Sequence, residues 1–129
     1  MTVKLKRSGF EQAQKLIRER YCVLDVRDDW SDHRPARTAK NRFIEECGWA
    51  AFGKWHLGED DEIAEHNKSR YKLPYGDFKN VHRCAVLSAE ARAGRYKYAE
   101  IELAAAHLHS MLDELMPESD KERRHVSTP

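Results

Sequence analysis

Long apolar runs, a secretory signal and a strong excess of one charge are all missing from this sequence. No apolar run reaches the roughly 18 residues that a membrane-spanning helix needs. The opening residues, "MTVKLKRSGFEQ", lack the apolar stretch of a secretory signal. The formal net charge is only +1, which does not favour a dedicated nucleic-acid binder. We therefore expect a cytoplasmic protein with no membrane partner.

Cysteine is scarce, and its spacing excludes two further classes of protein. The cysteines (Cys22, Cys47 and Cys84) are odd in number, widely spaced and form no C-x-x-C pair. This spacing argues against a disulfide framework and against a thiolate zinc site. The sequence also lacks G-x-S-x-G, H-E-x-x-H, a phosphate-binding glycine loop and a dinucleotide fingerprint. We predict neither a cofactor nor a bound metal.

What is present is a heavily charged chain whose charges are blocked by sign. Of 129 residues, 40% are hydrophobic and 35% are charged, which is typical of a globular protein. Residues 59–65 and 98–118 hold acids and no Lys or Arg, whereas 68–97 hold eight bases and two acids. These blocks either neutralise one another or leave a basic surface. We predict a single globular domain over 1–116 and a disordered tail over 117–129.

The first half of the chain predicts two helices and two strands. Ser8 and Glu11 have the spacing of a capping box, and the apolar spacing behind them predicts a helix over 9–20. Residues 21–26 are typical of a short strand. A second helix is predicted over 36–47, with Gly48 as its stop signal. The alternation over 49–57 predicts a second strand, paired antiparallel with 21–26.

The second half predicts mainly helices. Residues 60–71 have weak helical character, and Asp77 is placed to cap a helix over 78–93. An amphipathic helix is predicted over 98–116, and its short connection to the preceding helix implies an antiparallel hairpin. The expected fold class is α+β, mostly α, with about five helices, a C-terminal antiparallel helical hairpin and a small two-stranded β element.

The stretch 71–97 combines aromatic rings and cationic side chains, and we predict a contact surface there. Tyrosines can stack on bases or pack on a protein, and Lys or Arg can bind phosphates. An exposed tryptophan in the loop 28–32 is a second candidate anchor for a partner. The candidate binding residues are Trp30, Lys72, Tyr75, Lys79, Arg83, Arg95 and Lys97. Arg92 is expected to bond the last carbonyls of its helix rather than a ligand.

Catalytic chemistry has weaker support. On a helix, His82 and Cys84 would point about 160° apart, which prevents direct activation of the thiol. Glu62 and His66, four residues apart, offer two metal ligands at most. An enzyme would have to assemble its site from residues such as His56, His66 and Glu62.

Three strings give the chain a family resemblance: "WHLG" at 55–58, "YKLPYGDFKNVHR" at 71–83 and "RAGRYKYAEIELAA" at 92–105. Over roughly residues 40–115, the chain resembles a family of small bacterial proteins with no assigned activity. The resemblance implies a bacterial, cytosolic origin and a turn followed by a helical hairpin as the core. It carries no catalytic residue.

Together these patterns favour a non-catalytic binding or regulatory module, with a protein partner or self-association as its contact. A nucleic-acid-binding protein that uses the same basic aromatic stretch is the first alternative. A small enzyme is the second.

Overall fold

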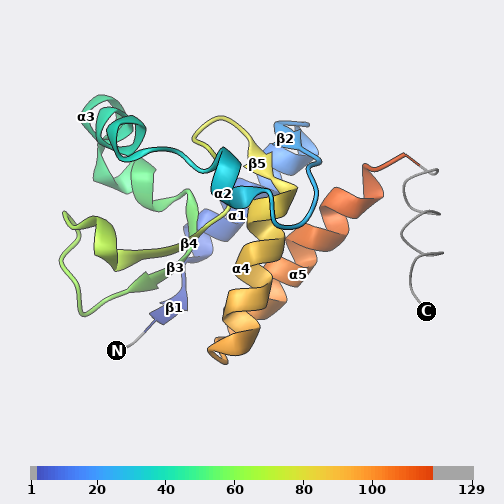
Figure 1. Ribbon diagram of the computed structural model, residues 1–129. Helices are drawn as coiled ribbons and strands as arrows, with labels where there is room; N and C mark the ends of the chain where they lie inside the picture. The colour runs from blue at the N-terminus through green and yellow to red at the C-terminus, as the bar shows by residue number, and fades with distance from the viewer. Residues whose placement is uncertain (1–2, 118–129) are drawn as a thin grey trace.

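The protein is described by a computed structural model, which defines residues 3–117. The predicted tail over 117–129 lies outside the described residues except for Pro117. Five helices are present within 3–117, together with five short strands, so the predicted α+β, mostly α class is confirmed (Figure 1). The helices are α1 (Arg7–Arg18), α2 (Trp30–His33), α3 (Arg37–Gly53), α4 (Arg83–Arg95) and α5 (Ala99–Glu114).

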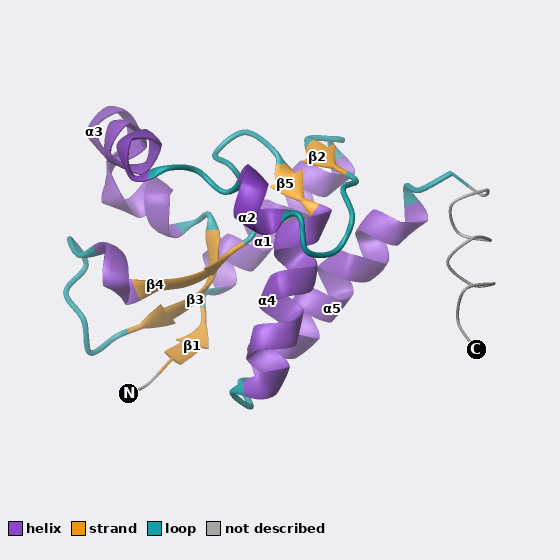
Figure 2. Ribbon diagram, in the orientation of Figure 1, coloured by secondary structure: helices purple, strands orange, loops and turns teal. Residues whose placement is uncertain are grey.

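The strands form two separate small sheets (Figure 2). The first has the order β1-β3-β4, with β1 (Val3–Leu5) and β4 (Tyr71–Pro74) each antiparallel to the central β3 (His56–Asp60). The second pairs β2 (Cys22–Val23) with β5 (Val81–His82) in parallel. A 3₁₀ turn, η1 (Lys68–Arg70), precedes β4. The two sheets hold the segments that surround the site described below.

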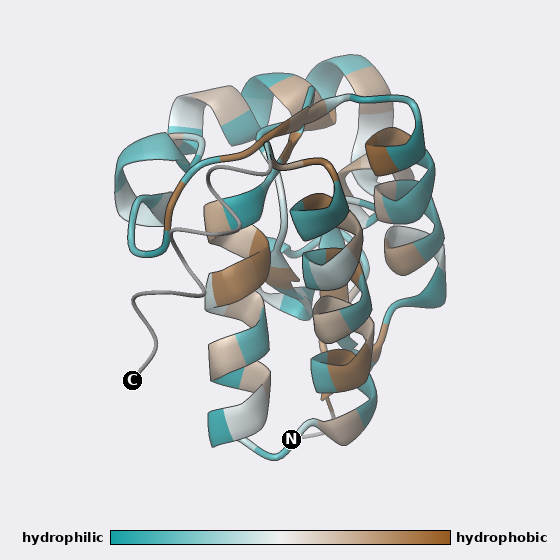
Figure 3. Cartoon of the chain, turned by 90° about the vertical axis from the view of Figure 1, so that its right-hand side faces the viewer, coloured by the Kyte–Doolittle hydropathy of each residue, from teal (hydrophilic) through white to brown (hydrophobic). Residues whose placement is uncertain are grey.

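The predicted C-terminal hairpin is confirmed: α4 and α5 lie side by side (Figure 1). Hydrophobic and hydrophilic residues alternate in bands along the helices (Figure 3). The apolar stripe of α5 contributes Ile101, Leu108 and Leu112 to the core. Helix α4 is buried more widely, because α5, β4 and β5 all pack against it. Among residues 3–117, no helix combines the length and apolar character that a bilayer crossing requires.

The predicted pairing of 21–26 with 49–57 is wrong. Residues 49–53 belong to α3, and the strand begins only at His56, next to β1 and β4. Trp49 and Phe52, which an alternating strand would place on opposite faces, share a helix face and have ring centroids 5.9 Å apart. Residues 22–23 pair instead with 81–82. The weak helix over 60–71 is also wrong, since only the 3₁₀ turn forms there.

The capping box at Ser8 is wrong as well, although the helix is confirmed as α1. Helix α1 begins at Arg7, and its N-cap residue, Lys6, makes no side-chain cap. Gly9 has a different role, because a Cβ at this position would lie 2.0 Å from the carbonyl oxygen of His56. The glycine therefore allows α1 to pack directly on the backbone of β3. This close approach fixes the start of β3, where His56 lies.

Gly48 acts as the predicted stop signal. With φ of 91° and ψ of 169° it is not helical, and α3 consists of two helical pieces that meet at a kink at this residue. This left-handed value is one that glycine adopts readily and other residues rarely adopt. The kink turns the second half of α3 toward the sheet and places Phe52 in the core.

Asp77 does not cap a helix over 78–93, and this prediction is also wrong. Its carboxylate accepts the backbone N–H groups of Lys79 (3.1 Å) and Asn80 (2.8 Å), so it closes a turn. Phe78 has φ of 74°, which is incompatible with a right-handed helix. The N–H of Val81 then bonds the carbonyl of Tyr21, which forms the second sheet. Helix α4 can therefore begin only at Arg83.

Candidate functional site

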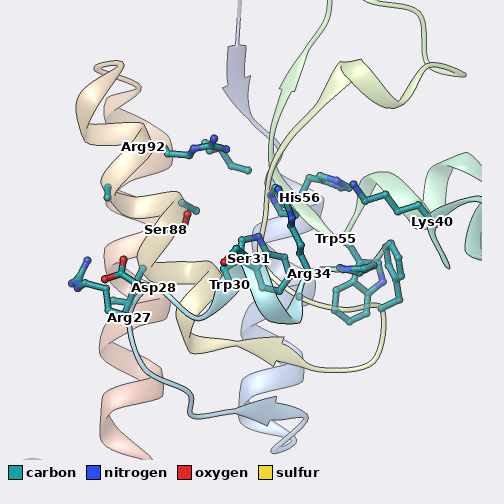
Figure 4. Close-up of a pocket in the computed structure, with 18 of the residues that line it drawn as sticks. Arg27, Asp28, Trp30, Ser31, Arg34, Lys40, Trp55, His56, Ser88 and Arg92 are labelled. Atoms are coloured by element: carbon teal, nitrogen blue, oxygen red, sulfur yellow. The ribbon is translucent and has the colours of Figure 1, made fainter. Parts of the chain in front are cut away.

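A cavity of about 530 Å³ lies between α4, the α2 segment, the start of α3 and the β3–β4 strands. Its size lies within the range of small-ligand sites. Figure 4 shows side chains from all of these elements around one space. The cavity therefore brings together segments from every third of the chain.

The cavity is rich in cationic side chains and poor in acids. Five lining residues carry Lys or Arg side chains, and one carries a carboxylate, Asp28. None of the five makes an ion pair with another residue of the described range 3–117. They are Arg27, Arg34, Lys40, Arg92 and Arg95.

The pKa of Lys40 responds to the positive charges around it. Partial burial lowers the pKa of Lys40, and the charges of Arg34 and Lys68 lower it further. Arg92 extends from the α4 side and Lys40 from the α3 side, with Arg34 between them (Figure 4). The site thus holds uncompensated positive charge, which an anion would neutralise.

Aromatic rings form the apolar part of the wall. Trp55 is 7% exposed, and its ring lies edge-on to Phe78, with centroids 6.0 Å apart. Phe78 in turn stacks on Phe43 of α3 at 4.4 Å. Trp30, from α2, completes the set. A planar organic group would find aromatic surface beside the cations.

His56 lies in the same wall and is 6% exposed. Its Nδ1 is 3.0 Å from the carbonyl oxygen of Phe52. Because a carbonyl only accepts, Nδ1 carries the proton and Nε2 is left with a lone pair. Burial lowers the pKa of His56 to about 4; the Phe52 and Gly53 carbonyls oppose this shift, whereas Lys40 and Lys6 add to it. The imidazole is therefore neutral at physiological pH.

A second buried histidine, His82, lies between two carboxylates. Its Nδ1 is 2.7 Å from Oδ2 of Asp25, and its Nε2 is 2.9 Å from Oδ2 of Asp77. Burial alone would lower the pKa of His82, but the hydrogen bonds and charges of both carboxylates outweigh burial and raise it. His82 is thus an imidazolium that donates from both nitrogens. The rings of Trp30 and His33, from α2, pack against it at 5.7 and 5.4 Å.

Asp25 also caps α4 from a distance in the sequence. Its Oδ1 accepts the backbone N–H of Cys84 at 2.8 Å, which satisfies a free donor in the first turn of the helix. Burial would raise the pKa of Asp25, but the bonds from Cys84 and His82 outweigh it and lower the pKa. One carboxylate therefore holds both the imidazolium and the helix start.

The expected 160° separation of His82 and Cys84 is wrong. His82 belongs to β5 and not to a helix, so donor atoms of all three residues lie within 4.8 Å of one another. These are the residue types that can bind a transition metal. However, both ring nitrogens of His82 already bond carboxylates, and burial followed by the charge of Asp25 raises the pKa of the Cys84 thiol to about 12. A protonated thiol beside an imidazolium is a poor nucleophile.

The structure places two of the predicted binding residues, Trp30 and Arg95, in the cavity wall. Lys79 and Lys97 are exposed outside the wall, and Lys72 is partly buried on β4. Their role in binding a partner stays a prediction.

Two of the predicted contact residues are in fact buried, so their expected exposure is wrong. Tyr75 is 0% exposed, and its hydroxyl donates to the carbonyl oxygen of Lys54 at 2.6 Å. Arg83 is 6% exposed and bonds Asp113 at 3.0 Å through Nε. The acidic blocks therefore neutralise part of the basic stretch: Asp113 pairs with Arg83, and Glu59 pairs with Arg70 at 3.3 Å.

Most of the cavity residues could not be recognised as site residues from the sequence around them. Arg27, Arg34 and Lys40 are single cations in different segments, and only the fold brings them together. Arg92 lines the cavity, and within the described range its side chain makes no hydrogen bond to the last helical carbonyls. Of the residues named for an enzyme, His56 reaches the cavity.

The other two residues named for an enzyme, His66 and Glu62, are exposed outside the cavity. His66 stacks on Trp49 at 5.7 Å.

Comparisons with family models, curated proteins and solved structures gave no match for this chain.

Proposed function

We propose that this chain is a non-catalytic binding module whose ligand is a small organic anion with a planar apolar part. One observation carries the proposal: five cationic side chains line one cavity with a single carboxylate among them, and none has an ion-pair partner within residues 3–117. Five cations with one carboxylate around the same cavity concentrate positive potential there, which favours an anionic ligand.

The wall chemistry defines the ligand class. The cations provide donors for a charged head group, and Trp30, Trp55 and Phe78 provide apolar surface for an organic body. Charge-assisted hydrogen bonds to such a head group each contribute about 1.5–3 kcal/mol. Burial lowers the pKa of Lys40, and the charges of Arg34 and Lys68 lower it further, so an anion beside Lys40 would favour its charged form.

The absence of an activated group supports binding rather than catalysis within the described residues. The Cys84 thiol is protonated, and both N–H groups of His82 are used in hydrogen bonds to Asp25 and Asp77. Neutral His56, with its pKa lowered to about 4, is a weak base.

Isothermal titration calorimetry with phenyl phosphate, phenyl sulfate and benzoate tests this function, with benzyl alcohol as the uncharged control. We expect saturable binding of at least one anion and no binding of benzyl alcohol. Arg92→Ala should weaken binding by about tenfold or more, whereas Arg18→Ala, on the exposed side of α1, should not. If none of the three anions binds at millimolar concentration, the proposed function is wrong.

Single-stranded nucleic acid is a second candidate, because Arg27, Arg92 and Arg95 of the cavity wall are exposed. A strand would place phosphates on these cations and a base against Trp30. Binding of a thymidine oligonucleotide should then be tighter than that of phenyl phosphate and should fall steeply with salt. An oligonucleotide that does not displace phenyl phosphate removes this candidate.

A further inference from the structure

We propose that the cavity selects phosphate monoesters, holding one proton between a phosphate oxygen and Nε2 of His56. The inference depends on the proposed function and specifies its ligand. It starts from an unusual feature of the wall: a hydrogen-bond acceptor that is buried among cations.

The acceptor is the free ring nitrogen of His56. The side chain lines the cavity, is 6% exposed and is held through Nδ1 by the Phe52 carbonyl at 3.0 Å. Within residues 3–117, the hydrogen bond of His56 with defined geometry is the one from Nδ1 to the Phe52 carbonyl, which leaves Nε2 without a partner there. A buried acceptor without a partner costs about 1–3 kcal/mol, so a ligand that supplies a donor there gains that amount.

Burial keeps His56 neutral, and the positive charges around it add to that effect. Lys40 reaches toward it from α3, and Lys6 lies just before α1. Arg34 shares the cavity wall, and the Tyr71 ring of β4 lies 5.7 Å from the imidazole. None of these neighbours is anionic at neutral pH. Nε2 of His56 therefore stays an acceptor and does not become a donor.

A ligand that fits both the cations of the wall and the acceptor Nε2 of His56 must be an anion that also carries a hydrogen-bond donor on its charged group. Carboxylates and sulfate esters are fully ionised at neutral pH and present only lone pairs, which would face the lone pair of Nε2. A phosphate monoester has a second pKa of about 6, so it keeps an O–H at mildly acidic pH. Its remaining oxygens accept from Arg34, Lys40 and Arg92, and its O–H donates to Nε2.

Above the second pKa of the phosphate, the same complex forms by uptake of a proton from solution. The dianion brings negative charge next to His56 and favours a proton at the shared position. Binding of a phosphate monoester is thus linked to proton uptake, and binding of a sulfate ester is not. The affinity for the phosphate monoester should rise as the pH falls from 8 to 6.

The test compares phenyl phosphate with phenyl sulfate by calorimetry at pH 6. The wild-type protein should bind the phosphate more tightly by about tenfold or more, because sites built around a buried polar group reject analogues that lack its partner. His56→Asn should abolish this preference. Its amide N–H can still donate to the Phe52 carbonyl, whereas the acceptor at the Nε2 position is removed. His66→Asn, outside the cavity, should keep the preference.

A second measurement uses only the wild-type protein, so it does not depend on whether His56→Asn folds. Phenyl phosphate is titrated at pH 7.5 in two buffers of different ionisation enthalpy. We expect uptake of close to one proton per bound phosphate and none for phenyl sulfate. If both esters bind equally, or if the phosphate binds with no proton uptake, the inference is wrong and the proposed function stands. If neither ester nor benzoate binds, both are wrong.

Discussion

His56 and His82 are buried to almost the same degree, at 6% and 4% exposure, yet they have opposite charge states. Burial, helped by the charges of Lys40 and Lys6, lowers the pKa of His56 to about 4, although the bond to the Phe52 carbonyl opposes this shift. His82 lies between Asp25 and Asp77, so its pKa is raised. The comparison shows that partners, and not burial alone, decide whether an imidazole carries charge.

His82 and His56 also differ in their roles in the molecule. Each ring nitrogen of His82 has a partner, and His82 joins the segments that carry Asp25 and Asp77. His56 has one nitrogen with no partner in the described range, and that nitrogen belongs to a cavity wall. A satisfied histidine stabilises a fold, whereas an unsatisfied one is available to a ligand.

The largest expected effect comes from breaking the His82 pair. Asp25→Ala removes a carboxylate from a buried ion pair and also the remote cap of α4. We expect a loss of about 4 kcal/mol in the free energy of unfolding, measured by urea denaturation.

The matched control for Asp25→Ala is Asp61→Ala. Asp61 pairs with Lys4 at 3.2 Å on the surface, so its loss should cost less than about 1 kcal/mol. Equal losses in the two variants would contradict the account of the His82 pair.

The second prediction concerns acid and His56. Its folded pKa of about 4 lies below the ordinary histidine value of about 6.5, so the unfolded chain binds the proton more tightly. The stability that neutral His56 contributes is present above pH 6.5 and is lost as the pH falls toward 4, by about 3 kcal/mol in total. Urea titrations at several pH values should show this loss in the wild type. A similar loss in His56→Asn would contradict the prediction.

The third prediction concerns Gly9, which allows α1 to pack on the backbone of His56. Gly9→Ala introduces a Cβ within 2.0 Å of the His56 carbonyl oxygen, so we expect a loss of about 2 kcal/mol. Ser8→Ala, one residue earlier, should change stability by less than about 0.5 kcal/mol, because the N-terminus of α1 has no side-chain cap. Thermal unfolding of the two variants compares them directly. A larger effect for Ser8→Ala would restore the capping box.

The smallest expected effect is the alkaline dependence of His82. Its pKa is raised in the folded state, so the stability it contributes is complete below the unfolded pKa of about 6.5 and is lost as the pH rises through the folded pKa. His82→Gln should therefore lose less stability than the wild type between pH 6 and 9. An unchanged slope in this variant would show that His82 is not charged at neutral pH.

Sequence reasoning identified the elements whose signals are local. Helices α1 and α5 follow from apolar spacing, and the short 96–98 connection gave the hairpin. Strand partners were not recovered, because the pairing of 22–23 with 81–82 depends on contacts about 59 residues apart. The start of α4 was misplaced because Asp77 caps a turn with the same local chemistry that caps a helix.

The candidate site was recovered only in part for a similar reason. Trp30 and Arg95 stood out by type and position, whereas Arg27, Arg34 and Lys40 are ordinary surface cations in sequence. The neutral state of His56 depends on its burial beside Phe52 and Lys40, which no local pattern encodes.

The most direct test of the account follows the ring proton of His56 by NMR across a pH titration, with and without saturating phenyl phosphate. The free protein should give a pKa of about 4 for His56. With phenyl phosphate bound, the pKa of His56 should rise, while the resonance of His82 should keep its own titration. If phenyl phosphate binds and the His56 titration is unchanged, the ligand does not contact Nε2, and the central claim is contradicted.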